Sequence, residues 1–410
     1  MPTTHSGFMI QSTHGVVGNL ELVVASPLGG LAHCWRNNNA AGFPWIGPQF
    51  FGSGDILGVS LIQSTLGTPG LGNLEVVVRE RDLLGLYQRS DQAPFTWYGP
   101  LYFAAGVAGN PALVQTRFGV TGNFEVVAPL ATAGLAHYWR DNDDPTFPWI
   151  GPTVFADSLG LVEAVALVHS TFGVPGNLEV IVRVGDQLFH LWRDSGPAFA
   201  WSDPTLIFSG ASGVPAFLQS RYGTVGNFEL VTPLVGGGMA HLWCDNDDPA
   251  QPWSAPTVFG TTEGPVDAVA LVHSTLGTPG LGNLELAARI GGHTAHYYRE
   301  DQSPFRWFGP TAFACDEPTY DPATEGEWRV PYASGVVGVH AALLHTGKVL
   351  FFSYEEHAGQ LHGDSSILDP DTGAVAKAHA DKNLFCAGQA LLPDGRLLVA
   401  GGASTGVQSL

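Results

Sequence analysis

Apolar and polar positions alternate in short runs along the first 310 residues, and the same succession of runs returns six times. In the third copy the runs cover 112–116, 123–127 and 135–140, and a fourth run begins at 148. Each run is bounded by Gly, Pro, Asn or Asp, which predicts a β-strand between two turns. Four short strands repeated in this way predict one propeller blade per copy, because radial closure removes exposed sheet edges.

Two positions keep the copies in register. The second strand of each copy begins Gly-Asn-(Leu/Phe)-Glu, and its glutamates are Glu21, Glu75, Glu125, Glu179, Glu229 and Glu285. A tryptophan follows near proline at intervals of 52, 52, 52, 52 and 54 residues, at Trp45, Trp97, Trp149, Trp201, Trp253 and Trp307. A repeat of this length indicates units that find their core by stacking on neighbours.

We therefore predict an all-β protein: a propeller of six four-stranded blades, each of about 52 residues, followed by an incomplete kelch-like β segment. A seven-bladed ring would need its last blade from the divergent sequence after residue 335, and an open solenoid would need capping repeats. The copies alternate between Pro and Arg after the second strand, as at Pro129 and Arg183, and three such pairs favour closure at six.

Composition sets the domain boundaries. The chain has 410 residues, and all three of its lysines follow residue 340. We predict a six-repeat propeller over 1–315, an acidic linker over 316–335, and a second β domain that begins over 336–410.

Charge and hydropathy exclude two classes of partner. With 13% charged residues and a net charge of −20, the chain has no basic surface for nucleic acid. No stretch reaches the roughly 18 apolar residues that a membrane helix needs, so we expect no membrane insertion. The N-terminus lacks a signal-peptide pattern, and we read the chain as soluble, with its compartment and oligomeric state left open.

The four cysteines, Cys34, Cys244, Cys315 and Cys386, have no Cys-x-x-Cys spacing, so neither a disulfide framework nor a zinc site is expected. Five histidines recur two positions before the aromatic residue of the third strand: His33, His137, His190, His241 and His296. Equivalent positions in different blades lie around a ring and do not converge on one ion. We expect these histidines to pack within blades, and no metal site.

The phrases GNFEVVAP and AHYWRDN resemble the Photorhabdus-type bacterial β-propeller lectins and, more distantly, the fungal fucose-binding propellers. The resemblance covers residues 8–314. It implies binding of glycans, notably fucosylated or O-methylated sugars, in sites between or beside blades. The blade number differs, since the Photorhabdus-type lectins have seven.

The residues themselves suit sugar binding, because a sugar needs an aromatic face for its C–H side and polar groups for its hydroxyls. The candidate ligand-binding residues are Trp35, Arg36, Trp139, Arg140, Trp192, Arg193, Trp243, Tyr298, Arg299, Glu21, Glu125 and Glu179. The alternative is structural: Glu and Arg pair on adjacent strands, and the aromatics wedge blades apart. Copies two and five have Gln88 and Cys244 at these positions and are not expected to bind a sugar.

The last part of the chain follows another pattern. HAALLHTGKVLFF, LDPDTG and NLFCAGQALLPDGRLLVAGG resemble the first kelch blades of the copper-radical oxidases, the galactose oxidase and glyoxal oxidase family, over residues 336–404. The resemblance implies that Cys386 stands for the cysteine that is cross-linked to a copper-binding tyrosine. No tyrosine or histidine partners follow, so we expect no catalytic residue, no cofactor in this chain, copper only in a complete oxidase domain, and a buried thiol at Cys386.

Three functions follow from these patterns. The leading prediction is a multivalent carbohydrate-binding propeller that targets a copper-radical-oxidase-type protein to glycans. The second is a fragment of a galactose or glyoxal oxidase-like enzyme. The third is a protein-interaction scaffold in which the recurring residues serve packing alone. Whether the chain is an enzyme stays open, with the balance toward a binding protein.

Overall fold

The computed structural model describes residues 3–315, 334, 336, 338–353, 364–370, 372–379 and 383–402. The chain divides into two compact units, Met1–Thr319 and Tyr320–Leu410. The predicted linker lies almost entirely outside the described residues, and each unit is considered by itself.

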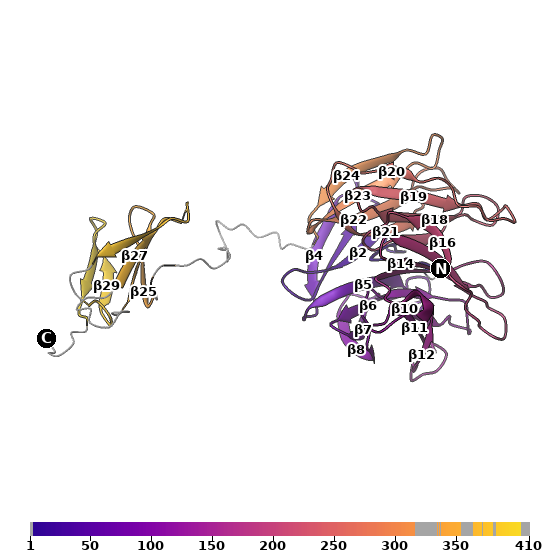
Figure 1. Ribbon diagram of the computed structural model, residues 1–410, viewed down its shortest axis with the longest axis horizontal. Helices are drawn as coiled ribbons and strands as arrows, with labels where there is room; N and C mark the ends of the chain where they lie inside the picture. The colour runs from indigo at the N-terminus through magenta and orange to yellow at the C-terminus, as the bar shows by residue number, and fades with distance from the viewer. Residues whose placement is uncertain are drawn as a thin grey trace. The chain divides into compact units, whose positions relative to one another are not determined.

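Six four-stranded antiparallel sheets make up the first unit, and each sheet uses four consecutive strands (Figure 1). Blade 1 contains β1 (Met9–Gln11), β2 (Leu20–Ala25), β3 (Leu31–Arg36) and β4 (Trp45–Phe51). Blade 2 contains β5 (Ile56–Gln63), β6 (Leu74–Glu80), β7 (Leu83–Arg89) and β8 (Trp97–Ala105). Blade 3 contains β9 (Ala112–Gln115), β10 (Phe124–Pro129), β11 (Leu135–Arg140) and β12 (Trp149–Phe155).

The remaining blades repeat this order after a short 3-10 helix, η1 (Asp157–Leu159). Blade 4 contains β13 (Ala164–His169), β14 (Leu178–Val184), β15 (Gln187–Arg193) and β16 (Thr205–Ser209). Blade 5 contains β17 (Ala216–Gln219), β18 (Phe228–Pro233), β19 (Met239–Cys244) and β20 (Thr257–Phe259). Blade 6 contains β21 (Val266–His273), β22 (Leu284–Ile290), β23 (His293–Arg299) and β24 (Trp307–Phe313).

The blades close into a ring through their first strands. Each first strand contacts that of the next blade, and β21 of blade 6 contacts β1 of blade 1. Residues 3–8 precede β1 and hydrogen-bond the first strands of blades 2, 3 and 4; for example, Leu61 N–H donates to Gly7 O and His169 N–H donates to Thr4 O. The predicted all-β, six-bladed propeller is confirmed.

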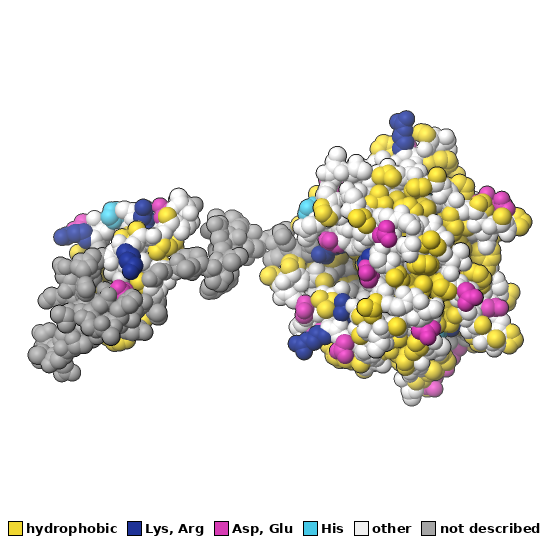
Figure 2. Space-filling model, in the orientation of Figure 1, with side chains coloured by type: hydrophobic (Ala, Val, Ile, Leu, Met, Phe, Trp, Pro, Cys, Tyr) yellow, Lys and Arg dark blue, Asp and Glu magenta, His cyan; other side chains and the backbone are white. Residues whose placement is uncertain are grey.

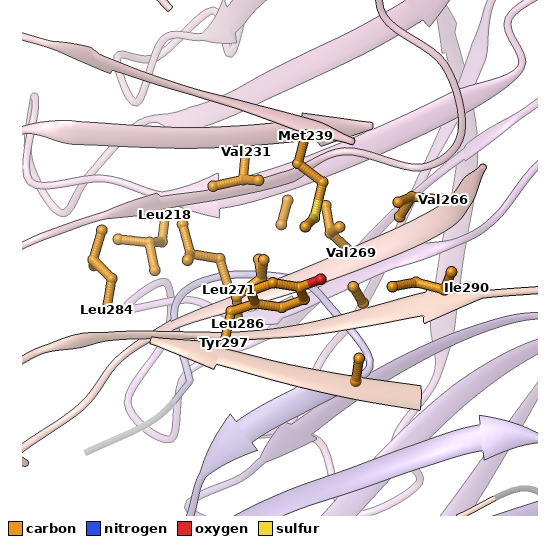
Figure 3. Close-up of a cluster of buried hydrophobic side chains, with 13 residues drawn as sticks. Leu218, Val231, Met239, Val266, Val269, Leu271, Leu284, Leu286, Ile290 and Tyr297 are labelled. Carbon is orange, nitrogen blue, oxygen red and sulfur yellow. The ribbon is translucent and has the colours of Figure 1, made fainter. Parts of the chain in front are cut away.

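The core lies between blades rather than inside one sheet. One buried cluster joins Leu218, Val231 and Met239 of blade 5 to Leu271 and Leu286 of blade 6 (Figure 3). Because consecutive residues of the second and third strands are buried, as in β10 and β11, and side chains alternate between the two faces of a sheet, each sheet has two faces to bury and needs a neighbour on each side. This explains why the repeat cannot stand alone.

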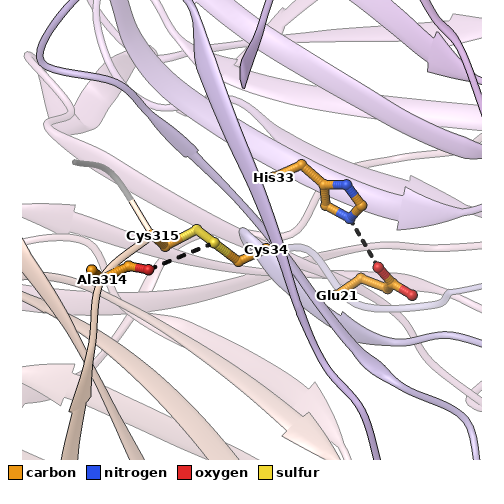
Figure 4. The surroundings of a disulfide bond; sticks show 5 residues. All are labelled: Glu21, His33, Cys34, Ala314 and Cys315. Carbon is orange, nitrogen blue, oxygen red and sulfur yellow. Dashed lines mark hydrogen bonds and ion pairs between the residues drawn. A yellow bond between two sulfur atoms is a disulfide. The ribbon is translucent and has the colours of Figure 1, made fainter. Parts of the chain in front are cut away.

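A disulfide bond joins Cys34 of β3 to Cys315, just after β24 (Figure 4). The prediction of no disulfide was wrong, because the two cysteines are 281 residues apart in sequence and only ring closure brings them together. No blade borrows a strand from the opposite end of the chain. The bond therefore links blade 1 covalently to the end of blade 6.

The fourth strands form the outer rim and carry exposed apolar side chains, among them Tyr98, Leu101 and Val154. Figure 2 shows charged side chains sparsely scattered among hydrophobic ones on the visible face of the first unit. No helix in the described part of the chain is long and apolar enough to cross a membrane.

The second unit contains a four-stranded antiparallel sheet and a separate hairpin. The sheet consists of β25 (His340–Leu343), β26 (Val349–Phe352), β27 (Asp364–Leu368) and β28 (Val375–His379). The hairpin consists of β29 (Gly388–Leu391) and β30 (Leu397–Ala400). Its kelch-like family assignment stays a prediction.

Cys386 lies in a turn before this hairpin, with φ 64°, and is exposed. The expected buried thiol was wrong, because residue 386 lies in a turn that leaves its side chain exposed.

Candidate functional site

In the five copies that have both residues, the Glu and the His face the same neighbouring blade. Glu21 of β2 pairs with Trp35 of β3, and Val23 pairs with His33. Partners in an antiparallel register point to the same side, so Glu21, His33 and Trp35 share one face. Arg36, the next residue on β3, lies on the opposite face.

In five blades the buried glutamate accepts a hydrogen bond from the histidine Nε2 of its own blade. The distances to Oε2 are 2.8 Å in His33–Glu21, 2.6 Å in His137–Glu125, 3.0 Å in His190–Glu179, 2.7 Å in His241–Glu229 and 2.7 Å in His296–Glu285. A serine from the first strand's end, such as Ser12, donates to the other carboxylate oxygen at 2.9 Å. The recurring histidines therefore orient the glutamates from within the blade.

The arginine reaches the glutamate of the preceding blade. Arg36 Nη1 lies 3.3 Å from Oε2 of Glu285, and Arg193 Nη2 lies 3.6 Å from Oε1 of Glu125. The ion pair thus crosses between blades, whereas the sequence suggested pairing on adjacent strands of one sheet. The reason is the strand alternation, which turns the arginine away from the Glu of its own copy.

Local turns hold the arginine in place, as in copy three. Arg140 Nε donates to Asn142 Oδ1 at 2.7 Å, and Asn142 Nδ2 donates to Gly122 O at 2.7 Å. Gly122 has φ 89°, and a Cβ there would lie 2.3 Å from Thr116 O. The Gly-Asn start of the second strand is thereby explained, since only glycine fits this turn.

Each interface between consecutive blades therefore draws its groups from two copies. Where the residues are present, blade n contributes its Glu, its His and the aromatic residue of its third strand, and blade n+1 contributes its Arg. We number the interfaces by their two blades: 1/2, 2/3, 3/4, 4/5, 5/6 and 6/1. Neighbours in sequence such as Trp139 and Arg140 belong to different interfaces, 3/4 and 2/3. They were predicted as a pair within one copy, and the structure places them at different interfaces.

A phenylalanine lies over each of these arginines and was not among the predicted ligand-binding residues. Its ring centroid is 5.1 to 5.5 Å from the guanidinium carbon at five interfaces, in the pairs Arg36–Phe43, Arg89–Phe95, Arg140–Phe147, Arg193–Phe199 and Arg299–Phe305. These phenylalanines are 39–48% exposed. Their regular spacing could have identified them, because they recur in the loop just before the tryptophan of each repeat.

These phenylalanines have a strained backbone. Phe43, Phe95, Phe147, Phe199 and Phe305 have φ between 46° and 57°, a region that bulky residues avoid. In blade 5 the same conformation is taken by Gln251, with φ 45°. Strain retained five times at an exposed aromatic residue indicates a functional constraint.

Several buried donors at the interfaces have no hydrogen-bond partner among the described residues. They include one guanidinium nitrogen of each interface arginine and the indole N–H of four tryptophans, namely Arg36 Nη2, Arg89 Nε, Arg140 Nη2, Arg193 Nε, Arg299 Nε, Trp97 Nε1, Trp149 Nε1, Trp201 Nε1 and Trp307 Nε1. The arginines are 6–8% exposed, and the unpaired atoms themselves are buried. Unpaired buried donors are uncommon in native structures, and each one calls for an explanation.

Five of the six tryptophans that recur about every 52 residues are wedges between blades, and each stacks on a phenylalanine of the preceding blade. The ring centroids lie 3.8 Å apart in Trp45–Phe313, 4.0 Å in Trp97–Phe51, 3.9 Å in Trp149–Phe103, 3.7 Å in Trp201–Phe155 and 4.3 Å in Trp307–Phe259. The third-strand aromatics are less covered, and Trp192 and Trp243 are 40% and 38% exposed. The two aromatic sets therefore have different surroundings.

Electrostatics distinguishes interface 2/3. Glu75 has no histidine beside it, because copy two carries Leu86 at that position. Burial raises the pKa of Glu75 to about 8, although Arg140 and Ser64 act in the opposite sense. In Glu21 burial also acts to raise the pKa, but the His33 hydrogen bond and the charge of Arg89 outweigh it and lower the pKa.

Interface 4/5 is the most divergent. Blade 5 has Cys244 where the others have arginine and Gln251 where they have phenylalanine, and Ile207 stands where the wedge tryptophan finds its stacking partner. A pocket of about 580 Å³ lies here, lined in part by Phe172, Trp192, Phe228 and Trp253. Glu179 and His190 form its polar side.

No protein-family model matches the chain, and no curated protein matches it. Among solved structures, a mutant of Aleuria aurantia lectin in complex with α-methyl-L-fucoside is 12% identical and covers 77% of this chain and 97% of its own, with a TM-score of 0.56. Another structure of that lectin, described as a six-bladed β-propeller with a novel fucose recognition mode, has a TM-score of 0.55 at 12% identity and the same coverage. The first unit shares their fold.

A triple arginine-to-alanine mutant of AofleA from Arthrobotrys oligospora is 11% identical, with a TM-score of 0.57, and covers 77% of this chain and 87% of its own. At such identities the similarity establishes the fold alone. Neither the Photorhabdus-type lectins nor the copper-radical oxidases are among these structures, and both resemblances stay predictions.

Proposed function

We propose that this protein is a multivalent carbohydrate-binding propeller whose sites lie between blades. The observation that carries the proposal is the exposed phenylalanine, held in a strained backbone over an arginine with an unpaired buried donor, at five interfaces. The ring offers a flat surface to the C–H face of a sugar, and the guanidinium edge and indole N–H donate to its hydroxyls.

The buried glutamate supplies acceptors for sugar hydroxyls and fixes the arginine. Each site alone offers a small contact area, and five or six sites on one rigid ring give avidity on a glycan-bearing surface. Fucosylated or O-methylated sugars are the first ligands to examine, since fungal propellers of the same fold include one in complex with α-methyl-L-fucoside.

A glycan array that includes fucosylated and O-methylated sugars, followed by calorimetry on the best ligand, tests this proposal. We expect saturable binding with more than one site per chain. The matched variants are Phe199→Ala at interface 3/4 and Leu28→Ala, an exposed apolar residue in the turn at the other end of the third strands. Phe199→Ala should lower the stoichiometry or affinity, and Leu28→Ala should leave both unchanged. A blank array favours the scaffold hypothesis.

For the second unit we keep the proposal that it belongs to an oxidase-type partner domain that the propeller brings to glycans. The described residues contain no group of three or more His, Cys, Asp or Glu side chains that could hold a metal, and Cys386 is exposed in a turn. We propose no copper-dependent step for the described residues.

A further inference from the structure

The interface between blades 4 and 5 retains one half of the repeated constellation and lacks the other. Glu179 keeps its hydrogen bonds with Ser170 at 3.0 Å and His190 at 3.0 Å, and its side chain is 4% exposed. The cation that faces this glutamate elsewhere is missing, because Cys244 replaces the arginine. Burial raises the pKa of the Cys244 thiol to about 12, so it contributes no charge near neutral pH.

At interface 2/3 an arginine occupies the space that corresponds to the pocket at interface 4/5. Arg140 lies opposite Phe124 in the strand register, and its guanidinium carbon is 4.0 Å from the Phe124 ring centroid. Cys244 lies opposite Phe228 in the same register. The chain thus binds a planar cation over this phenylalanine in blade 3, and in blade 5 the pocket reaches the same ring.

The pocket at interface 4/5 is built for a cation with an attached apolar face. Phe172, Phe228 and Trp253 line it together with Glu179, and aromatic rings beside a carboxylate favour a cation. Trp192, 40% exposed, also lines it and offers a surface on which a sugar ring can stack. The amide of Gln251 adds hydrogen-bonding groups on the blade 5 side.

We propose that this pocket binds an amino sugar with a free amine, whose ammonium group lies over Phe228 beside Glu179. The ammonium takes the position that arginine holds at the other interfaces. The inference rests on the proposed function in treating blade interfaces as ligand sites, and it assigns one of the six interfaces a ligand class of its own.

Calorimetry with the full chain at about pH 6, where ordinary amines are protonated, tests the inference with D-glucosamine as the probe. We expect one site per chain and roughly tenfold weaker binding of N-acetyl-D-glucosamine, in which the amine is neutralised, a difference in the range of a cation–aromatic contact. Equal affinity for the two sugars would overturn the inference, as would equal binding of tetramethylammonium, which has no sugar ring.

Three variants locate the site. Cys244→Arg restores the guanidinium over Phe228 and should abolish glucosamine binding, whereas Cys244→Ala keeps the pocket and should retain it. Glu179→Gln, which removes the carboxylate beside the ammonium, should weaken glucosamine binding roughly tenfold, a loss that does not depend on Cys244→Arg folding well. Glucosamine binding that is unchanged by both Cys244→Arg and Glu179→Gln would refute the assignment.

The proposed function is measured separately in the same samples with α-methyl-L-fucoside. Loss of neutral-sugar binding at all interfaces, with the glucosamine results intact, would overturn the proposed function and leave this inference standing. Fucoside binding with no preference for the free amine would do the reverse.

Discussion

At the scale of single residues, the strained phenylalanines are the feature that packing alone does not explain. A phenylalanine at positive φ costs about 1–3 kcal/mol, and Phe199 recovers little of that by burial because it is 47% exposed. Its ring lies against Arg193 at 5.3 Å. The loop therefore maintains an exposed ring at the expense of stability.

Replacing Phe199 by glycine should separate its effect on stability from its contribution to sugar binding. Glycine removes the backbone strain and the ring together, so the free energy of unfolding should change by less than about 1 kcal/mol, against about 3–5 for a core phenylalanine. Sugar affinity at interface 3/4 should fall roughly three- to tenfold, the range of an aromatic contact. Denaturant unfolding and calorimetry measure the two quantities. Gln251→Gly, with the same φ and no ring, is the control and should not change binding at interface 3/4.

Glu75 gives a second prediction at this scale. Its pKa is about 8 in the folded protein against an ordinary 4.5, so between these values the folded state holds the proton more tightly than the unfolded state. The free energy of unfolding should therefore fall as pH rises from about 4.5 to 8. Glu75→Gln, which stays neutral, should be more stable than the parent at pH 8 and show a flatter profile in thermal melts at several pH values.

The sister residue Glu125 provides the comparison. His137 lies 2.6 Å from its carboxylate, so Glu125→Gln weakens a charge-assisted hydrogen bond and should destabilise the protein by roughly 1–3 kcal/mol. If Glu75→Gln and Glu125→Gln behave alike, the distinct electrostatics of interface 2/3 is refuted.

At the scale of elements, one strand contributes side chains to two interfaces. On β11, Trp139 lies on the face with Glu125, toward blade 4, and Arg140 on the face toward blade 2. This division follows from the two-residue period of a strand. The two faces of a blade therefore belong to two different interfaces.

Paired substitutions on β11 test this division. Trp139→Ala should weaken interface 3/4 and Arg140→Ala interface 2/3, so the double variant should lose two sites per chain where a one-site blade would lose one. Calorimetric stoichiometry with the best glycan distinguishes the two. Trp139→Ala combined with Arg193→Ala is the matched control, since both residues belong to interface 3/4, and it should lose one.

At the scale of the whole molecule, closure of the ring is the main requirement. Every blade is made of consecutive strands, so among the described residues no strand ladder joins blade 6 to blade 1. Gln11 and Thr275 exchange hydrogen bonds there, with Thr275 N–H donating to Gln11 Oε1 at 2.8 Å, and Arg36 reaches Glu285. The Cys34–Cys315 bond adds a covalent link at this interface.

Removing that link should open the ring more easily. Because the bond spans 281 residues, the double variant Cys34→Ala, Cys315→Ala should lose roughly 2–5 kcal/mol of stability, mainly through the greater entropy of the unfolded chain. Thermal melts with and without reductant provide the measurement, and Cys244→Ala, which breaks no disulfide, is the control. Equal melting temperatures for oxidised and reduced parent protein would contradict this role.

Several properties of this protein were predictable from its sequence because they depend on local pattern and period. Alternating apolar runs bounded by Gly and Asn specify the strands, and the recurrence of Trp45 and its equivalents every 52 residues specifies six blades of one kind. The residue types at each interface were also predictable, as Glu125, Trp139 and Arg193 illustrate, since they recur in register.

Only the tertiary structure decided which of these residues meet. Arg193 reaches Glu125 of the blade before it, although 68 residues separate them and the sequence offered a partner in its own copy. Cys34 meets Cys315 only after the ring has closed. The repeat period determines which residue types each blade contains. Contacts between blades depend on which face of a strand each side chain occupies and on how the blades stack, and only the tertiary structure determines these two properties.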